Sequence, residues 1–177
     1  YFEIVDFSNP AIPSRLGRIT LPTIINDISL EGGYAYIAND ENGLRIIDIS
    51  DPSAPFEAGY LEGGYDASGV AATGGYAYLA AESAGIRVID ISDPSAPLEV
   101  GSYDTAGYVG RVAVAGDYIY AAWSSAGMRI LDIADRENPY EVGLWKTDDN
   151  VRGVDVEGSF AYVADYGAGL RVIDVSD

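Results

Sequence analysis

The sequence predicts an all-β protein, a β-propeller built from four-stranded antiparallel blades with a 42-residue repeat. Three observations lead to this prediction. A phrase that reads LRIIDISDPSAP from Leu44 recurs along the chain, and its aspartate returns every 42 residues with no insertion or deletion. Alternating aromatic and small residues, typical of strands, occupy much of the remaining repeat. No window keeps a 3.6-residue apolar period, and glycine or proline interrupts every possible helix.

The copies of this phrase set the frame of the repeat. Clear copies begin at Ile86 and Met128, a truncated copy begins at Leu170, and a degenerate copy begins at Phe2. A fixed period of this length indicates a repeat architecture, and it outranks any local pattern. We call the recurring aspartates the ladder aspartates, and they are Asp6, Asp48, Asp90, Asp132 and Asp174.

Each repeat divides into four predicted strands. The first is a short apolar run, such as Asp27–Glu31, that ends in a glycine turn suited to a hairpin. The second alternates aromatic and small residues, as in YAYIA from Tyr34. The third is the LRIIDIS segment, whose continuous apolar content predicts burial on both faces. A DPSAP turn, whose prolines cannot donate to a ladder, leads to the fourth strand. One glycine recurs in this strand and predicts a bulge or a close approach, at Gly17, Gly59, Gly101 and Gly143.

Four short antiparallel strands in each repeat describe one propeller blade, whereas a sandwich would not repeat its sequence and solenoid coils are usually shorter. We predict one domain over residues 1–177, with full blades at about 25–66, 67–108 and 109–150 and blade remnants at 1–24 and 151–177. The last copy of the third strand duplicates the place of the first, so the repeats do not close neatly as a four-bladed ring. We therefore expect a partial propeller, or one completed by other chain segments or subunits.

The third-strand motif also resembles a known family. The segment LRVIDVSD from Leu170, together with the DPSAP turn and the GxYAYxA strand, is similar to the LVIVD-repeat family of β-propellers over essentially the whole chain. The segment IRVID resembles the third strand of WD-repeat blades as well, although the Trp-Asp pair is absent. The family resemblance implies a scaffold or interaction module of an extracellular or cell-surface protein.

Composition limits the partners. The chain carries 28 acidic and 10 basic residues, for a net charge of −18, which argues against nucleic acid and anionic membranes. There is no cysteine, so disulfides and thiolate chemistry are excluded. No apolar run approaches membrane-spanning length, and we expect no membrane insertion. Because the sequence begins at Tyr1 without a methionine, we expect a processed product or an excised piece.

Residues that recur in every repeat are expected to be structural. Each ladder aspartate should accept backbone N–H groups of the turn that follows, because equivalent positions around a ring are too far apart to act on one substrate. The alternating tyrosines should pack between blades instead of stacking on sugars. The recurring arginines should form ion pairs or hydrogen bonds with carboxylates of neighbouring blades; they are Arg45, Arg87, Arg129 and Arg171.

Function should belong to positions that break the repeat. The loops between strands two and three, and between strand four and the next strand one, diverge and are expected on one face, around the channel mouth. We call this the loop face. Its carboxylates and aromatics suit a protein or glycan partner, or Ca²⁺, although ordinary solvated loops are the alternative for any single residue. The candidate binding residues are Asp40, Glu41, Tyr65, Asp66, Asp104, Tyr108, Trp123, Asp148, Asp149 and Tyr166.

We predict that the protein is not an enzyme. Histidine is absent, which removes the usual general base and the imidazole metal ligands. The carboxylates of the loop face leave Ca²⁺ as the only metal considered, although Asp40–Gly43 lacks the ligand spacing of an EF-hand, and no cofactor is expected. Two alternatives to a binding module stay open. One is a structural subunit that tiles into an array or filament, and the other is a hydrolase that uses carboxylates alone, such as Asp148 and Asp149.

Overall fold

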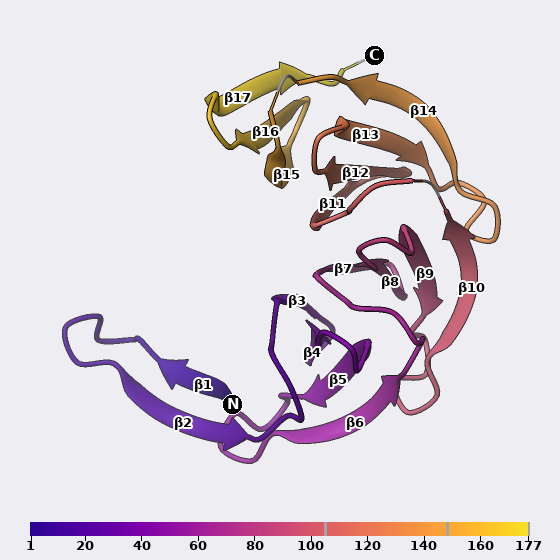
Figure 1. Ribbon diagram of the computed structural model, residues 1–177. Helices are drawn as coiled ribbons and strands as arrows, with labels where there is room; N and C mark the ends of the chain where they lie inside the picture. Colours follow the sequence, from indigo (N-terminus) through magenta and orange to yellow (C-terminus); the bar gives the residue numbers. More distant parts are fainter. Residues whose placement is uncertain (105, 148, 177) are drawn as a thin grey trace.

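The computed structural model describes residues 1–104, 106–147 and 149–176, and its regular structure there is entirely β. In these ranges the strands form five antiparallel sheets, which confirms the predicted propeller-blade architecture (Figure 1). Every sheet is a simple meander in which strands adjacent in sequence are hydrogen-bonded. The chain therefore builds one small sheet, moves on, and builds the next.

Three sheets are complete blades. Blade A contains β3 (Asp27–Glu31), β4 (Tyr34–Ala38), β5 (Leu44–Asp48) and β6 (Phe56–Leu61). Blade B contains β7 (Gly69–Thr73), β8 (Tyr76–Ala80), β9 (Ile86–Asp90) and β10 (Leu98–Tyr103). Blade C contains β11 (Arg111–Ala115), β12 (Tyr118–Trp123), β13 (Gly127–Asp132) and β14 (Tyr140–Trp145).

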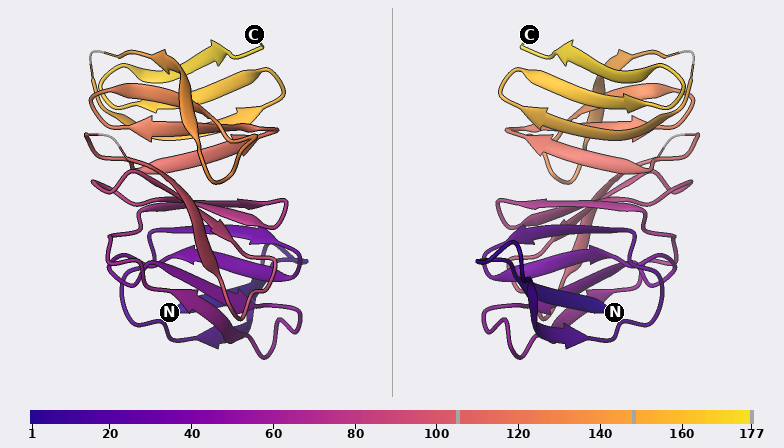
Figure 2. Two further views of the ribbon diagram at one scale, coloured as in Figure 1. Left: turned by 90° about the vertical axis from the view of Figure 1, so that its right-hand side faces the viewer. Right: turned by 90° about the vertical axis from the view of Figure 1, so that its left-hand side faces the viewer.

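Two sheets are incomplete among the described residues. The opening hairpin supplies a third and a fourth strand, β1 (Phe2–Asp6) and β2 (Ser14–Ile19). The closing sheet supplies strands one to three, β15 (Val151–Glu157), β16 (Phe160–Asp165) and β17 (Gly169–Asp174). The sheets follow one another around an open arc, with β3, β7, β11 and β15 on its inner side and the opening hairpin and closing sheet at its two ends (Figure 1). Side views show the same sheets in succession along the arc (Figure 2).

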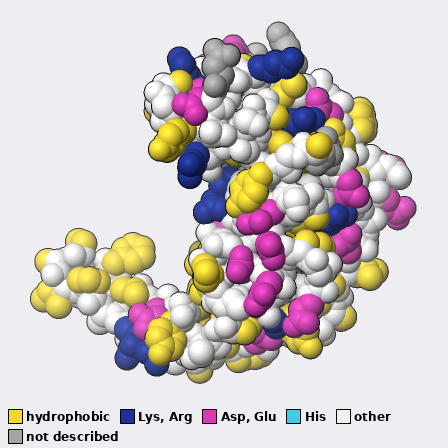
Figure 3. Space-filling model, in the orientation of Figure 1, with side chains coloured by type: hydrophobic (Ala, Val, Ile, Leu, Met, Phe, Trp, Pro, Cys, Tyr) yellow, Lys and Arg dark blue, Asp and Glu magenta, His cyan; other side chains and the backbone are white. Residues whose placement is uncertain are grey.

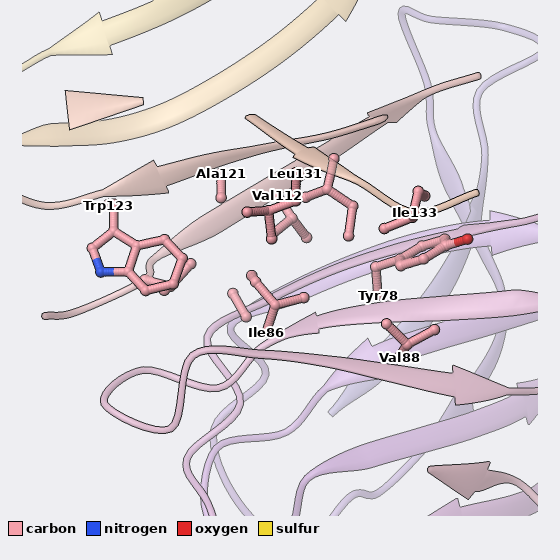
Figure 4. Close-up of a cluster of buried hydrophobic side chains, with 11 residues drawn as sticks. Tyr78, Ile86, Val88, Val112, Ala121, Trp123, Leu131 and Ile133 are labelled. Carbon is pink, nitrogen blue, oxygen red and sulfur yellow. The ribbon is translucent and has the colours of Figure 1, made fainter. Parts of the chain in front are cut away.

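The hydrophobic cores lie between blades. The forward face of a blade, which we define as the face toward the next blade along the chain, packs on the backward face of that next blade. Between blades B and C, Tyr78, Ile86 and Val88 meet Val112 and Leu131 (Figure 4). Burial of these apolar surfaces is the main favourable term in holding neighbouring blades together. The prediction that the alternating tyrosines pack between blades is confirmed for Tyr36, Tyr78 and Tyr120, which are buried in the cores between sheets. It does not hold for Tyr118 and Tyr162, which are 41% and 37% exposed.

The recurring glycine of the fourth strand serves both predicted purposes. The pairing of strands three and four shifts beside it, as between Ile46 and Ile47 opposite Gly59, which is a β-bulge. A Cβ atom on Gly59 would also collide with the carbonyl oxygen of Pro94, in the turn of the next blade. Gly17 and Gly101 receive the turns that contain Pro52 and Arg136 in the same way. We call this arrangement the glycine socket.

The ladder aspartates are structural, as predicted. In each copy one carboxylate oxygen accepts the backbone N–H two residues later, at 2.9 Å for Asp48 and Ser50 and at 2.8 Å for Asp132 and Ala134. Hydrogen bonds from the hydroxyl and the backbone N–H of Ser50 lower the pKa of Asp48. The remaining copies make the same contact: Asp6 with Ser8, Asp90 with Ser92, and Asp174 with Ser176.

One expectation is wrong for the described arginines. They do pair with carboxylates, but the partners lie in the same blade instead of a neighbouring one. Arg45 on β5 contacts Glu57 on β6 at 3.4 Å and Glu62 at 3.0 Å. Strands three and four are hydrogen-bonded neighbours in the same sheet, so a long arginine side chain reaches strand four more easily than the next blade. Arg87 with Glu99, and Arg129 with Glu141, repeat this pairing.

Candidate functional site

The loop face has a repeated backbone beneath its divergent side chains. Asp40, Glu82 and Ser124 occupy the same place in successive loops between strands two and three, and all three adopt positive φ, with φ of 51°, 46° and 34°. Each forms a bridge with a residue at the start of the next sheet, either two residues before strand one (Ala67 and Val109) or its first residue (Val151). A positive φ is uncommon for residues other than glycine, and here the bridge between blades holds it in place. Asp40 therefore has a structural backbone role.

Several candidate residues are tied into the scaffold. The Tyr65 hydroxyl donates a hydrogen bond to Glu99 at 3.0 Å, and burial together with the Glu99 charge raises the pKa of Tyr65. Asp104 pairs with Arg87 at 3.0 Å. Asp149 accepts the backbone N–H of Gly167 at 2.8 Å and thereby joins the two kinds of loop. These three side chains stabilise the shape of the loop face.

Trp123 does not lie on the loop face, and that prediction is wrong. Its side chain is 0% exposed and packs in the core between blades B and C. Its indole N–H donates to the Ala106 carbonyl at 3.3 Å, and a Cβ atom on Gly107 would touch the ring. The position at the end of strand two is buried in every repeat, although it holds asparagine, alanine, tryptophan or aspartate. The residues that differ between repeats at this position therefore lie in the core and not on the loop face. The four residues at this position are Asn39, Ala81, Trp123 and Asp165.

The remaining candidates are accessible to different degrees. Glu41, Asp66, Tyr108 and Tyr166 are exposed, and the Tyr166 side chain is 70% exposed. Asp148 lies outside the described residues. Of the exposed candidates, Tyr108 lies at a cavity and Tyr166 lies beside it.

This cavity has a volume of about 480 Å³ and lies between blade C and the closing sheet, beside the loop that joins blade B to blade C. It includes two arginines at strand-one positions that the sequence analysis did not select, Arg111 and Arg152. Its described lining contains no acidic residue, which is unusual in a chain of net charge −18. We call it the arginine cavity, and it is lined by Tyr108, Gly110, Arg111, Ser124, Asn150, Val151 and Arg152.

The two arginines are held differently. The Arg111 guanidinium donates to the Asn26 and Gly110 carbonyls, both at 2.9 Å, and to the Ser68 carbonyl, so it joins three successive blades at their inner ends. The exposed Arg152 places its guanidinium 4.7 Å from the centre of the Tyr166 ring. Such a stacked guanidinium keeps its N–H donors available at the ring edge.

The polar groups around the arginines are aligned by neighbours. The Tyr108 hydroxyl donates to Glu82 at 2.9 Å, and burial and this hydrogen bond raise the pKa of Tyr108. The Ser124 hydroxyl donates to Asn150 Oδ1 at 3.2 Å. The cavity thus presents guanidinium and amide groups around a concave surface, an arrangement that suits an anionic group on a ligand.

Metal binding gains no support from the described residues. No group of three or more acidic, histidine or cysteine side chains among them is arranged to hold a metal ion. Within the same part of the chain, no helix has the length and apolar character needed to cross a membrane.

The fold is shared with solved structures of low sequence identity. The computationally designed Ika4 protein matches with a TM-score of 0.70 and 8% identity, over 89% of this chain and 94% of that one. A chain of the mitotic checkpoint complex matches with a TM-score of 0.69 and 10% identity, over 86% of this chain and 48% of that one. The designed Ika8 protein matches with a TM-score of 0.66 and 12% identity, over 84% and 45%. The chain therefore spans about half the length of the last two.

No curated protein matches the sequence. The model of the LVIVD repeat matches five segments of the chain, at residues 1–20, 24–62, 63–105, 106–147 and 149–177. These segments cover nearly all of the sequence, and each contains one ladder aspartate. The chain belongs to the LVIVD repeat family.

Proposed function

We propose that this protein is a non-catalytic β-propeller module of an extracellular or cell-surface protein, and that it binds a protein or glycan partner through the loop face. We further propose that the arginine cavity receives a carboxylate of that partner. The single observation that supports this function is the exposed Arg152 guanidinium on a cavity whose described lining contains no acidic residue, in a strongly acidic chain. The second guanidinium, that of Arg111, is already held by three backbone carbonyls and lies 3.8 Å from Asp27. The proposed location follows from the family resemblance, and the acidic composition agrees with it.

The chemistry of the cavity favours an acidic ligand over a neutral one. A guanidinium forms charge-assisted hydrogen bonds with a carboxylate, and these are roughly twice as strong as neutral ones. The surrounding negative charge of the protein would repel an anion at other places on the surface, so it would direct binding to this cavity. Asn150 and the Tyr108 ring add an amide and an aromatic surface of the kind that sugars contact.

The test compares a hexagalacturonate, whose carboxylates are free and charged, with its methyl ester, in which they are neutral. Binding of each to the full chain is measured by isothermal titration calorimetry at low and at physiological salt. We expect the acid form to bind and the ester to bind at least about tenfold more weakly, a difference of about 1.4 kcal/mol. Equal binding of the two forms, or no binding of either, would refute an acidic ligand of this type.

A matched pair of variants locates the site. Arg152→Gln removes the cavity guanidinium that stacks on Tyr166. Arg18→Gln removes a guanidinium that stacks on the Tyr1 ring at 3.9 Å, far along the arc, and serves as the control. We expect Arg152→Gln to weaken binding about tenfold or more and Arg18→Gln to leave it unchanged. If both variants bind like the parent, the cavity is not the site.

A further inference from the structure

The face opposite the loop face is built from turns. In each complete blade it carries the glycine turn between strands one and two and the proline turn between strands three and four. We call it the turn face. Where blade A meets blade B, a cavity of about 420 Å³ lies on this face, lined in part by Glu31, Tyr34 and Pro94. Both blades have all four strands, so this cavity belongs to an ordinary junction between blades.

At the next junction, between blades B and C, an arginine of the chain itself occupies the same place. Arg136 stands at the repeat position of Pro94, in the turn that precedes strand four. Its guanidinium lies 5.7 Å from the centre of the Tyr76 ring and 3.2 Å from the Asp117 carboxylate. The Tyr76 ring is the counterpart of Tyr34 in blade A. The junction between blades B and C therefore shows which group this place accepts, a guanidinium held by an aromatic ring and a carboxylate.

The junction between blades A and B has lost that pair but keeps the ring. Pro94 replaces the arginine, and Gly75 stands at the position of Asp117. Tyr34 remains on the cavity, and its described lining contains no basic residue. The ring that Arg136 covers in one junction is thus left without a cation in the other.

A carboxylate enters the cavity between blades A and B from another position. Glu31 ends β3, where blade B has the uncharged Thr73. Its Oε1 accepts the backbone N–H of Gly74 at 2.6 Å, which fixes the side chain across the junction. Its Oε2 is buried and has no hydrogen-bond donor in the described part of the chain. Burial and then the negative charge of Glu31 raise the pKa of Tyr36, which also lines the cavity.

The free oxygen of Glu31 favours a charged donor. A buried polar atom without a partner costs free energy, and a hydrogen bond from a cation recovers it. A planar guanidinium can stack on an aromatic ring while its N–H groups reach a carboxylate at the ring edge, whereas an ammonium acts as a compact point charge. Glu31 and Tyr34 together therefore suit a guanidinium.

We propose that the cavity between blades A and B binds the guanidinium of an arginine side chain from a partner protein or peptide. The guanidinium lies over the Tyr34 ring and donates to Glu31 Oε2, as Arg136 lies over Tyr76 and pairs with Asp117. An arginine within a polypeptide fits better than the free amino acid, because the net charge of −18 repels a free carboxylate. This site differs from the arginine cavity in both its face and the charge of its ligand.

The first test compares Nα-acetyl-arginine amide with the citrulline analogue, which has nearly the same shape and no charge. Acidic side chains also gather over the middle of the arc (Figure 3), so attraction of a cation does not by itself identify the site. Binding to the full chain is therefore followed at physiological salt by amide chemical shifts in nuclear magnetic resonance. We expect the arginine probe to shift Gly74 and Gly75 and to bind at least about tenfold more tightly than the citrulline probe.

Three outcomes of this comparison would overturn the proposal. One is equal binding of the arginine and citrulline probes. Another is a set of shifts that spreads over the acidic surface and leaves Gly74 and Gly75 unchanged. The third is tighter binding of free L-arginine than of the blocked probe, which would exclude a polypeptide side chain as the source.

A pair of charge variants locates the site. Glu31→Gln keeps an oxygen that can accept the Gly74 N–H but removes the charge, and we expect it to weaken arginine binding about tenfold. Glu137→Gln is the matched control, because it removes the same charge from an exposed side chain in the proline turn of blade C. We expect the control to bind like the parent. Equal effects of the two variants would mean that the bulk charge of the protein attracts the probe, and would overturn the site.

Pro94→Arg tests whether the chain can fill its own cavity. The backbone should accept the change, because the Arg136 carbonyl oxygen faces Gly101 in the same way as the Pro94 carbonyl oxygen faces Gly59. We expect Pro94→Arg to keep its circular dichroism spectrum and to lose binding of the arginine probe, and Pro94→Ala, which leaves the cavity open, to retain it. Binding that persists in folded Pro94→Arg would overturn the proposal. The blocked probes have no carboxylate, so their binding is independent of the arginine cavity.

Discussion

Replacing Trp123 by alanine should destabilise the fold strongly, and it separates a core role from a binding role. The side chain is fully buried, packs edge-on against Tyr103 with ring centroids 6.0 Å apart, and lies beneath the Arg129 guanidinium at 4.9 Å. Truncation of a buried tryptophan typically costs about 3–5 kcal/mol, since the lost contacts leave a cavity. In a domain of this size such a loss corresponds to a decrease in Tm of about 6–20 °C.

The assay is urea unfolding followed by circular dichroism, with the free energy of unfolding taken from the linear extrapolation. Tyr166→Ala is the control, because this aromatic side chain is 70% exposed, and we expect it to change stability by no more than about 0.5 kcal/mol. A loss below about 1 kcal/mol for Trp123→Ala would refute the core role. If Trp123→Ala left the stability unchanged but abolished ligand binding, Trp123 would have a binding role on the loop face and no core role.

Further predictions concern the sockets, the titrating groups and calcium. Gly101→Ala, which collides with the turn of the next blade, should cost about 1–3 kcal/mol in urea unfolding, whereas Gly153→Ala, whose Cβ meets only Ala164 at 3.7 Å, should not; equal effects would contradict the socket. The ladder aspartates with lowered pKa stabilise the fold above the ordinary carboxyl value of 3.8 and lose this contribution as pH falls through their folded pKa values. Replacing one of them by asparagine should therefore flatten the dependence of the urea midpoint on pH between about 5 and 2, and an unchanged slope would show that the turn contacts contribute nothing. Because the pKa of Tyr65 is raised, stability should fall as pH rises above 10.0, and Tyr65→Phe should reduce this fall; the alkaline unfolding midpoints of the two proteins decide it. Addition of Ca²⁺ should leave Tm unchanged, and a concentration-dependent increase in Tm would reveal a site that the described residues do not form.

The strands could be predicted from the sequence because the repeat supplies several copies of the same information. The predicted first strand Asp27–Glu31 and the segment that begins at Tyr34 coincide with β3 and β4. The recurring glycine was ambiguous between a bulge and a close approach, and the structure shows both. The partner of that glycine could not be predicted, because the turn that fills the socket comes from a different blade and no local pattern links the two positions.

Loop divergence was a weaker guide to the candidate site, since side chains that differ between repeats can differ inside the core. Trp123 illustrates the error, because its position is buried in all copies and changes only in size and polarity. The predicted partners of the arginines failed for a related reason. Sequence spacing places a glutamate in strand four of each complete blade but does not say whether the arginine reaches it within a blade or across to the next one.

The same comparison of repeats, applied to charged residues inside strands, does lead to the arginine cavity. Arg45, Arg87 and Arg129 recur with strand-four glutamates and form the scaffold's own ion pairs. Arg111 and Arg152 do not recur: the corresponding positions of other repeats hold aspartate or glycine, and asparagine, serine or glycine. An arginine that does not recur is not explained by what the repeat needs to fold. Arg111 has a structural role of its own, because it binds carbonyls at the inner ends of three blades. The exposed Arg152, on the same cavity, binds no such set of carbonyls among the described residues. Arg152 is therefore the residue at which the binding proposal is most directly tested.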